Sequence, residues 1–224
     1  MPPKAQELET TGRCWFRNAL AESELHALER ACLTDQRPGA RLGLAGDLRE
    51  LLASEGTTPA LAHQLLPESK PVRIVAFNKS ASTNWSVPWH QDRVIAVAQR
   101  HDVEGFGGWS NKDGVWHCEP PIAILSAMIF ARIHFDDTDE KNGCFELALG
   151  THAHGWIASD QAHAVASSAP REICTAKRGD VLFVKALALH RSASSKTGDP
   201  RRALRVDYVN LDLRPPLEWA CETA

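Results

Sequence analysis

Apolar residues in the first part of the chain recur every three or four positions, which is the spacing of an amphipathic α-helix. Three helices are predicted there, over residues 23–32, 47–56 and 58–66. Ser23 is placed to cap the first helix, Gly56 to end the second in a left-handed conformation, and Pro59 to open the third. Residues 1–70 are therefore expected to form a helical N-terminal part.

From residue 71 onward, short runs rich in Val, Ile and Phe replace the helical spacing. Strands are predicted over residues 72–77, 93–97, 128–133, 181–184 and 203–209. Turn sequences separate them, of which Asn142-Gly143 is a strong hairpin signal and Gly179-Asp180 a weaker one. Short strands at this spacing are typical of a sandwich or jelly roll, so a mainly β core is expected over residues 71–224.

Composition narrows the class of protein. The chain has 224 residues, 43% hydrophobic and 24% charged, and we expect one domain over residues 1–224. A formal net charge of −3 favours a small-molecule partner over nucleic acid or a membrane. The six cysteines form no C-x-x-C pair, and the longest apolar stretch, 122–131, is too short to span a bilayer, so a cytoplasmic protein is expected. No pattern indicates an oligomeric state.

The first candidate chemistry lies in the run from Asn84 to Ile95. If this run is a strand, His90 and Asp92 point to the same face and form a two-ligand metal clip, although a surface ion pair has the same pattern. His190, at the end of an apolar run, adds a second imidazole. Two histidines and one carboxylate suit non-heme iron(II), because three ligands on one face leave neighbouring positions open.

The next predicted strand begins near an arginine that could pair with the carboxylate of a bound 2-oxo acid. If a 2-oxo acid chelates the iron, its far carboxylate needs a paired positive charge when it is buried. Arg201 stands 11 residues after His190 and can hold a carboxylate through two parallel hydrogen bonds. Ser192 lies on the same strand face as His190 if that strand continues, and its hydroxyl is a further donor.

Three segments, residues 79–92, 136–155 and 179–208, together resemble the phytanoyl-CoA dioxygenase family of iron- and 2-oxoglutarate-dependent oxygenases. The resemblance implies a double-stranded β-helix core and dioxygen as co-substrate. It implies that iron is held by His90, Asp92 and His190, and that 2-oxoglutarate is bound by Arg201, Ser192 and, near an aromatic ring, Trp109. The expected reaction is hydroxylation of a small organic molecule with release of succinate and carbon dioxide. Related halogenases lack the carboxylate ligand, so Asp92 disfavours halogenation.

Substrate contacts are the least constrained part of the prediction. Arg132 and His134 alternate with apolar residues along a predicted strand and can face the interior, where they would meet an anionic substrate, or form a polar outer face. Lys79 and Asn84 can close over the site or be solvated in a loop. The alternative function is a cupin-like barrel that binds a metal or ligand without oxidative chemistry, as an isomerase or sensor does.

Overall fold

The structure is a computed structural model in which residues 1–33, 39–54, 56–79 and 84–222 are described. Its helical segments are α1 (Pro3–Thr11), α2 (Glu22–Cys32), α3 (Asp47–Arg49), η1 (Glu50–Ser54), α4 (Thr57–Leu65), α5 (Ile122–Ala127), η2 (Thr151–His154), α6 (Ala162–Ser168) and η3 (Ala220–Glu222). Its strands are β1 (Arg13–Phe16), β2 (Gly39–Leu42), β3 (Lys70–Lys79), β4 (Val87–His90), β5 (Ile95–Val97), β6 (Gly107–Lys112), β7 (Val115–Glu119), β8 (Ile129–His134), β9 (Phe145–Ala148), β10 (Arg171–Cys174), β11 (Val181–Lys185), β12 (His190–Ser192) and β13 (Arg201–Val209).

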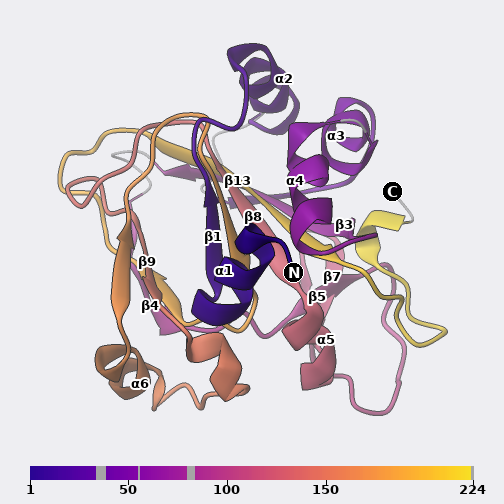
Figure 1. Ribbon diagram of the computed structural model, residues 1–224. Coiled ribbons are helices and arrows are strands. Elements are labelled where there is room, and N and C mark those ends of the chain that lie inside the picture. The colour runs from indigo at the N-terminus through magenta and orange to yellow at the C-terminus, as the bar shows by residue number, and fades with distance from the viewer. Residues whose placement is uncertain (34–38, 55, 80–83, 223–224) are drawn as a thin grey trace.

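The described strands form three antiparallel sheets, so the protein is mainly β. A six-stranded sheet has the order β1-β11-β8-β13-β3-β2, a four-stranded sheet the order β10-β9-β12-β4, and a three-stranded sheet the order β5-β7-β6. Figure 1 shows α2, α3 and α4 on one side of the central strands β8 and β13, with β4 and β9 on the other. The six-stranded sheet therefore has helices over one face and the four-stranded sheet over the other.

Alternation along β8 explains these layers. Ile129, Ala131 and Ile133 belong to the apolar core shared with the N-terminal helices, whereas Phe130 packs with Phe145 in the core between the two sheets. Successive side chains of a strand point to opposite faces, so Arg132, two residues after Phe130, also faces the second sheet. The inner face of this sheet is where polar side chains can reach a site.

The predicted strands are confirmed as β3, β5, β8, β11 and β13, and the three predicted helices as α2, α3 with η1, and α4. The N-terminal part is not entirely helical, because β1 and β2 lie within residues 1–70 and join the six-stranded sheet. Each of these two strands has only four residues, too few for alternation to show in the sequence. Their pairing depends instead on β11 and β3, which lie far away in the chain.

Two predicted helix caps are wrong. The residue before α2 is Ala21, and Ser23 lies inside the helix, where Glu22 and Glu24 give the first turn the negative charge that favours a helix start. Gly56 has φ −71° and precedes α4, so it is not a left-handed stop; residue 55 lies outside the described residues. At the start of α4, the backbone N–H and the hydroxyl of Thr57 donate to the carboxylate of Glu24 in α2, at 2.9 and 2.6 Å, a contact between helices that a single segment does not reveal.

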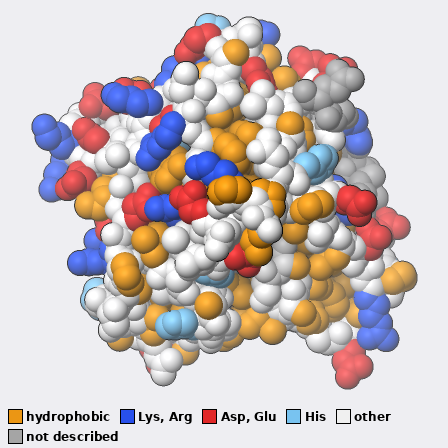
Figure 2. All heavy atoms as spheres, in the orientation of Figure 1, with side chains coloured by type: hydrophobic (Ala, Val, Ile, Leu, Met, Phe, Trp, Pro, Cys, Tyr) orange, Lys and Arg blue, Asp and Glu red, His pale blue; other side chains and the backbone are white. Residues whose placement is uncertain are grey.

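On the face shown in Figure 2, side chains of both charges are interspersed. None of the helices within the described part of the chain combines the length and apolarity that crossing a bilayer requires.

Candidate active site

The two predicted histidines and the aspartate meet between the sheets. β4 ends at His90, β12 begins at His190, and the two histidines are directly opposite each other in the antiparallel pair. Asp92 lies two residues after β4 rather than within it, yet one ligand atom from each of the three residues lies within 4.8 Å of the others. The predicted grouping of His90, Asp92 and His190 is therefore present as a cluster that could hold a metal.

Backbone carbonyls orient both imidazoles. The Nδ1 of His90 lies 2.8 Å from the carbonyl oxygen of Pro88, and the Nδ1 of His190 lies 2.9 Å from that of Ala188. A carbonyl only accepts, so Nδ1 carries the proton in each ring and Nε2 keeps its lone pair for a metal. Burial, followed by the neighbouring His90, lowers the pKa of His190 to about 3, so His190 is neutral and able to bind a metal at physiological pH.

Arg205 holds the carboxylate. Its Nη1 donates to Oδ2 of Asp92 at 2.7 Å, and its Nε donates to Oδ1 of Asp207 at 2.6 Å. Asp207 is in turn paired with Arg73, whose Nε lies 2.6 Å from Oδ2. Burial alone would raise the pKa of Asp92, but Arg205 and then His190 lower it well below its usual range. Asp92 is therefore ionised, with one oxygen fixed by a guanidinium.

Replacing Arg205 with methionine is expected to weaken iron(II) binding by about 10–100-fold, the usual cost of losing the group that orients a metal ligand. The substitution also leaves two buried carboxylates without this partner, which lowers the free energy of unfolding. Metal titration of the folded fraction measures the first effect. Arg205→Lys restores the charge and should recover part of the affinity; an unchanged affinity in Arg205→Met would show that Arg205 does not position Asp92.

A cavity of about 160 Å³ opens on this cluster. Besides the cluster, five basic side chains line it, together with aromatic and apolar ones. The basic residues are Lys79, Arg132, Arg191, Arg201 and Arg205, and the others are Phe77, Trp85, Val87, Phe130 and Phe145. Arg201 begins β13, as predicted, and is only 2% exposed. Its Nε and Nη1 are buried without a hydrogen-bond partner. Two unpaired donors of a buried guanidinium fit a bound carboxylate.

Two more predicted residues lie at the cavity beside Arg201. Lys79 is opposite Arg201 in the pairing of β3 with β13. The Nζ of Lys79 donates to the carbonyl of Trp85 at 2.9 Å and lies 3.4 Å from Oγ of Ser192, which also lines the cavity. Burial, followed by the charges of Arg201 and Arg132, lowers the pKa of Lys79 to about 7. Lys79, Ser192 and Arg201 are thus brought together at one end of the cavity.

Three other predicted residues do not line this cavity. His134 is buried and stacks on Trp15, with ring centroids 5.8 Å apart, and it does not line the cavity. Asn84 bonds to the backbone of Ser195 through both amide atoms, at 2.7 and 2.8 Å. Trp109, on β6 of the three-stranded sheet, packs in a separate apolar cluster with Arg100 against its ring.

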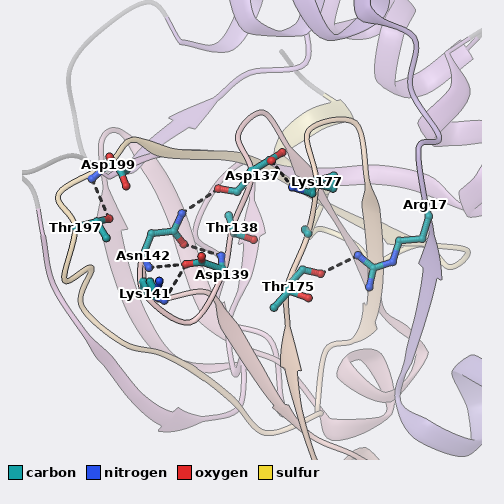
Figure 3. Close-up of a pocket in the computed structure, with 11 residues that line it drawn as sticks. Arg17, Asp137, Thr138, Asp139, Lys141, Asn142, Thr175, Lys177, Thr197 and Asp199 are labelled. Carbon is teal, nitrogen blue, oxygen red and sulfur yellow. Dashed lines mark hydrogen bonds and ion pairs between the residues drawn. The ribbon is translucent and has the colours of Figure 1, made fainter.

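A larger hollow of about 680 Å³ lies elsewhere on the molecule (Figure 3). Several of its polar side chains are already paired with one another or with the backbone. The Nζ of Lys177 lies 2.7 Å from a carboxylate oxygen of Asp137, Asn142 donates to the carbonyl of Asp137 at 2.9 Å, and Arg17 donates to that of Thr175 at 2.8 Å. None of the predicted ligands lines this hollow, so the smaller cavity is the candidate active site.

Neither the role of Arg205 nor the phenylalanine side chains of the lining were predicted from the sequence. Alternation along the predicted strand could have identified Arg205, because residues four apart in a strand share a face and Arg201 was already assigned. Phe145 had no such signal, since β9 is only four residues long and was not predicted. Its ring centroid lies 4.9 Å from that of His190.

Comparisons with known proteins identify the fold and the family of the chain. No curated protein matches the chain in sequence. Among solved structures, AviO1 from Streptomyces viridochromogenes Tue57 is 17% identical, with 95% of this chain and 96% of that chain covered and a TM-score of 0.66. HygX from Streptomyces hygroscopicus, solved with nickel, 2-oxoglutarate and hygromycin B bound, is 16% identical, with 93% and 87% covered and a TM-score of 0.62. EctD from S. alaskensis, solved with 2-oxoglutarate and 5-hydroxyectoine, is 15% identical, with 93% and 76% covered and a TM-score of 0.68.

These likenesses show the fold. The family model described as phytanoyl-CoA dioxygenase matches residues 8–203, which is most of the chain. The chain therefore belongs to the phytanoyl-CoA dioxygenase family of iron- and 2-oxoglutarate-dependent oxygenases.

Proposed function

We propose that this oxygenase hydroxylates a small organic molecule, with His90, Asp92 and His190 as the iron ligands and Arg201, assisted by Ser192, as the anchor of 2-oxoglutarate. The observation that carries the proposal is the cluster of two imidazoles and one carboxylate facing a cavity lined by Arg201, two of whose nitrogen donors are buried without partners. Three ligands from one side suit iron(II), which needs open positions for its co-substrates.

The chemistry divides between cofactor and protein. Iron(II) with 2-oxoglutarate and dioxygen supplies an oxidant that can replace a C–H bond by C–OH. The side chains supply position: the carbonyls of Pro88 and Ala188 fix the imidazoles, and Arg205 fixes Asp92. Phe130 and Phe145 make the wall beside His190 apolar, which limits water near the reacting carbon.

The same proposal covers the architecture. We take the six-stranded and four-stranded antiparallel sheets to be the two halves of a double-stranded β-helix, within one domain over residues 1–224 that includes the N-terminal helices. Support comes from the cluster of His90, Asp92 and His190 between the sheets, and from the apolar core that joins the helices to the outer face of the six-stranded sheet. Five cysteines are buried free thiols, which supports a reducing, cytoplasmic environment: Cys14, Cys32, Cys118, Cys144 and Cys174.

Mass spectrometry of the products tests the reaction type. We expect purified protein with iron(II), 2-oxoglutarate and ¹⁸O₂ to release succinate, slowly without substrate and faster with the correct one. The organic product should gain one labelled oxygen atom. If the product has instead lost two hydrogens and gained no oxygen, the reaction is desaturation or ring formation and not hydroxylation. If 2-oxoglutarate is not consumed at all, the proposed oxygenase activity is wrong. The alternative function, a barrel that binds a metal or ligand without oxidative chemistry, would then be favoured.

A further inference from the structure

The inner face of the six-stranded sheet carries four basic side chains at the cavity. Arg201 and Arg205 share a face of β13, Lys79 lies opposite Arg201, and Arg132 lies opposite Arg205. Arg205 has two carboxylate partners, Asp92 and Asp207. Within the described ranges, no carboxylate forms an ion pair with the other three.

Arg132 is the most unusual of the three. Its Nε is buried without a hydrogen-bond partner. Its guanidinium carbon lies 5.6 Å and 5.4 Å from the ring centres of Phe77 and Phe145, so two aromatic rings lie close to it. Burial, followed by the charges of Arg201 and Arg205, lowers the pKa of Arg132 to about 9, which still leaves it charged at neutral pH. A buried cation without a counter-charge destabilises a fold, so a ligand that supplies the negative charge would be bound favourably.

The co-substrate 2-oxoglutarate does not supply enough negative charge to neutralise these cations. One of its carboxylates would neutralise the iron together with Asp92, and the other would pair with Arg201 at the end of the cavity that Lys79 shares. The backbone of Arg132 lies at the level of Arg205, but Arg201 is the charge that affects the Arg132 guanidinium most, so the two guanidinium groups face the same part of the cavity. The far carboxylate of 2-oxoglutarate carries one negative charge, whereas Arg201 and Arg132 carry two positive charges. One positive charge therefore remains without a counter-charge after iron and 2-oxoglutarate are counted.

We propose that Arg132 binds an acidic group of the substrate, and that the substrate is a small carboxylic acid. This inference rests on the proposed function. The planar guanidinium presents parallel N–H donors to a carboxylate. The rings of Phe77 and Phe145 on either side provide apolar contact for the carbon skeleton next to that group. Phe145 also contacts His190, so a substrate held between Arg132 and Phe145 lies beside the three proposed metal ligands.

Acetate is the probe for this site, and acetamide is its neutral control of the same shape. Calorimetric titrations use the protein loaded with nickel(II) and 2-oxoglutarate, without turnover. We expect acetate to bind at one site per chain and acetamide to bind at least tenfold more weakly. Arg132→Gln should weaken acetate binding at least tenfold while changing the Kd of 2-oxoglutarate less than twofold. Arg178→Gln is the matched control, because Arg178 is paired with Glu29 at 3.0 Å and does not line the cavity, and the acetate affinity of this variant should not change.

Three results would overturn the inference: no acetate binding to the loaded wild-type protein, equal binding of acetate and acetamide, or a loss of 2-oxoglutarate affinity in Arg132→Gln as large as that in an Arg201 variant. The last result would assign Arg132 to the co-substrate. The wild-type comparison of acetate with acetamide does not depend on whether any variant folds. Failure of the wild-type protein to bind 2-oxoglutarate would instead refute the proposed function, so the two failures are distinguishable.

Discussion

Replacing His190 with alanine is expected to abolish iron-dependent consumption of 2-oxoglutarate. His190 is 4% exposed, its Nδ1 is fixed by the carbonyl of Ala188, and its Nε2 lies 3.5 Å from Oδ2 of Asp92. Loss of a group that merely orients a metal ligand costs about 10–100-fold in affinity, so loss of a ligand should reduce succinate formation by more than about 100-fold. Succinate release, measured with iron(II) and without added substrate, checks this.

His152→Ala is the matched control for this substitution. The sequence from His152 to His154 offers a second pair of histidines, but the Nε2 of His152 lies 3.0 Å from the backbone oxygen of Glu9, away from the cavity. We expect this variant to keep iron binding and succinate formation. Equal loss in both variants would indicate general destabilisation, and retained activity in a folded His190→Ala protein would remove His190 from the metal site.

Replacing Arg201 with methionine is expected to raise the Kd of 2-oxoglutarate by about a hundredfold or more. Two donors of this guanidinium are buried without partners, and each charge-assisted hydrogen bond contributes roughly 1.5–3 kcal/mol. A loss of 1.4 kcal/mol is tenfold in affinity, so two bonds account for at least about a hundredfold. Titration of the nickel-loaded protein with 2-oxoglutarate measures the change.

Arg201→Lys separates charge from geometry. Lysine keeps the positive charge but cannot present two parallel donors, so we expect it to recover only part of the affinity. Metal binding should be unchanged in both variants, because Arg201 does not contact the three ligands. A Kd within about threefold of wild type in Arg201→Met would mean that 2-oxoglutarate is anchored elsewhere.

The grouping of His90, Asp92 and His190 could be predicted from the sequence, because two of these residues lie close together along one strand direction and the third follows a strongly apolar run. His90 and Asp92 are two residues apart, and the pair keeps its common direction even though β4 ends at His90. His190 and Arg201 each begin a strand next to a strongly apolar run or a clear β-rich pattern. Side-chain chemistry and strand periodicity were sufficient for these residues.

The remaining features depend on contacts between distant segments. β1 and β2 exist because β11 and β3 offer edges for pairing. Arg132 and His134 occupy the same face of β8, but only Arg132 reaches the cavity, since His134 is covered by Trp15. Trp109 was assigned by resemblance alone and lies in another sheet. The layer packed against a strand decides which of two side chains on the same face can meet a ligand. That layer cannot be predicted from the sequence of one strand.

The central claim is that His90, Asp92 and His190 bind iron(II) together with 2-oxoglutarate. Anaerobic titration of the protein with iron(II) and then 2-oxoglutarate, followed by visible absorption, tests it most directly. We expect a charge-transfer band that saturates at one iron and one 2-oxoglutarate per chain and is absent in His190→Ala. No band in the wild-type protein, or an undiminished band in His190→Ala, would contradict the claim.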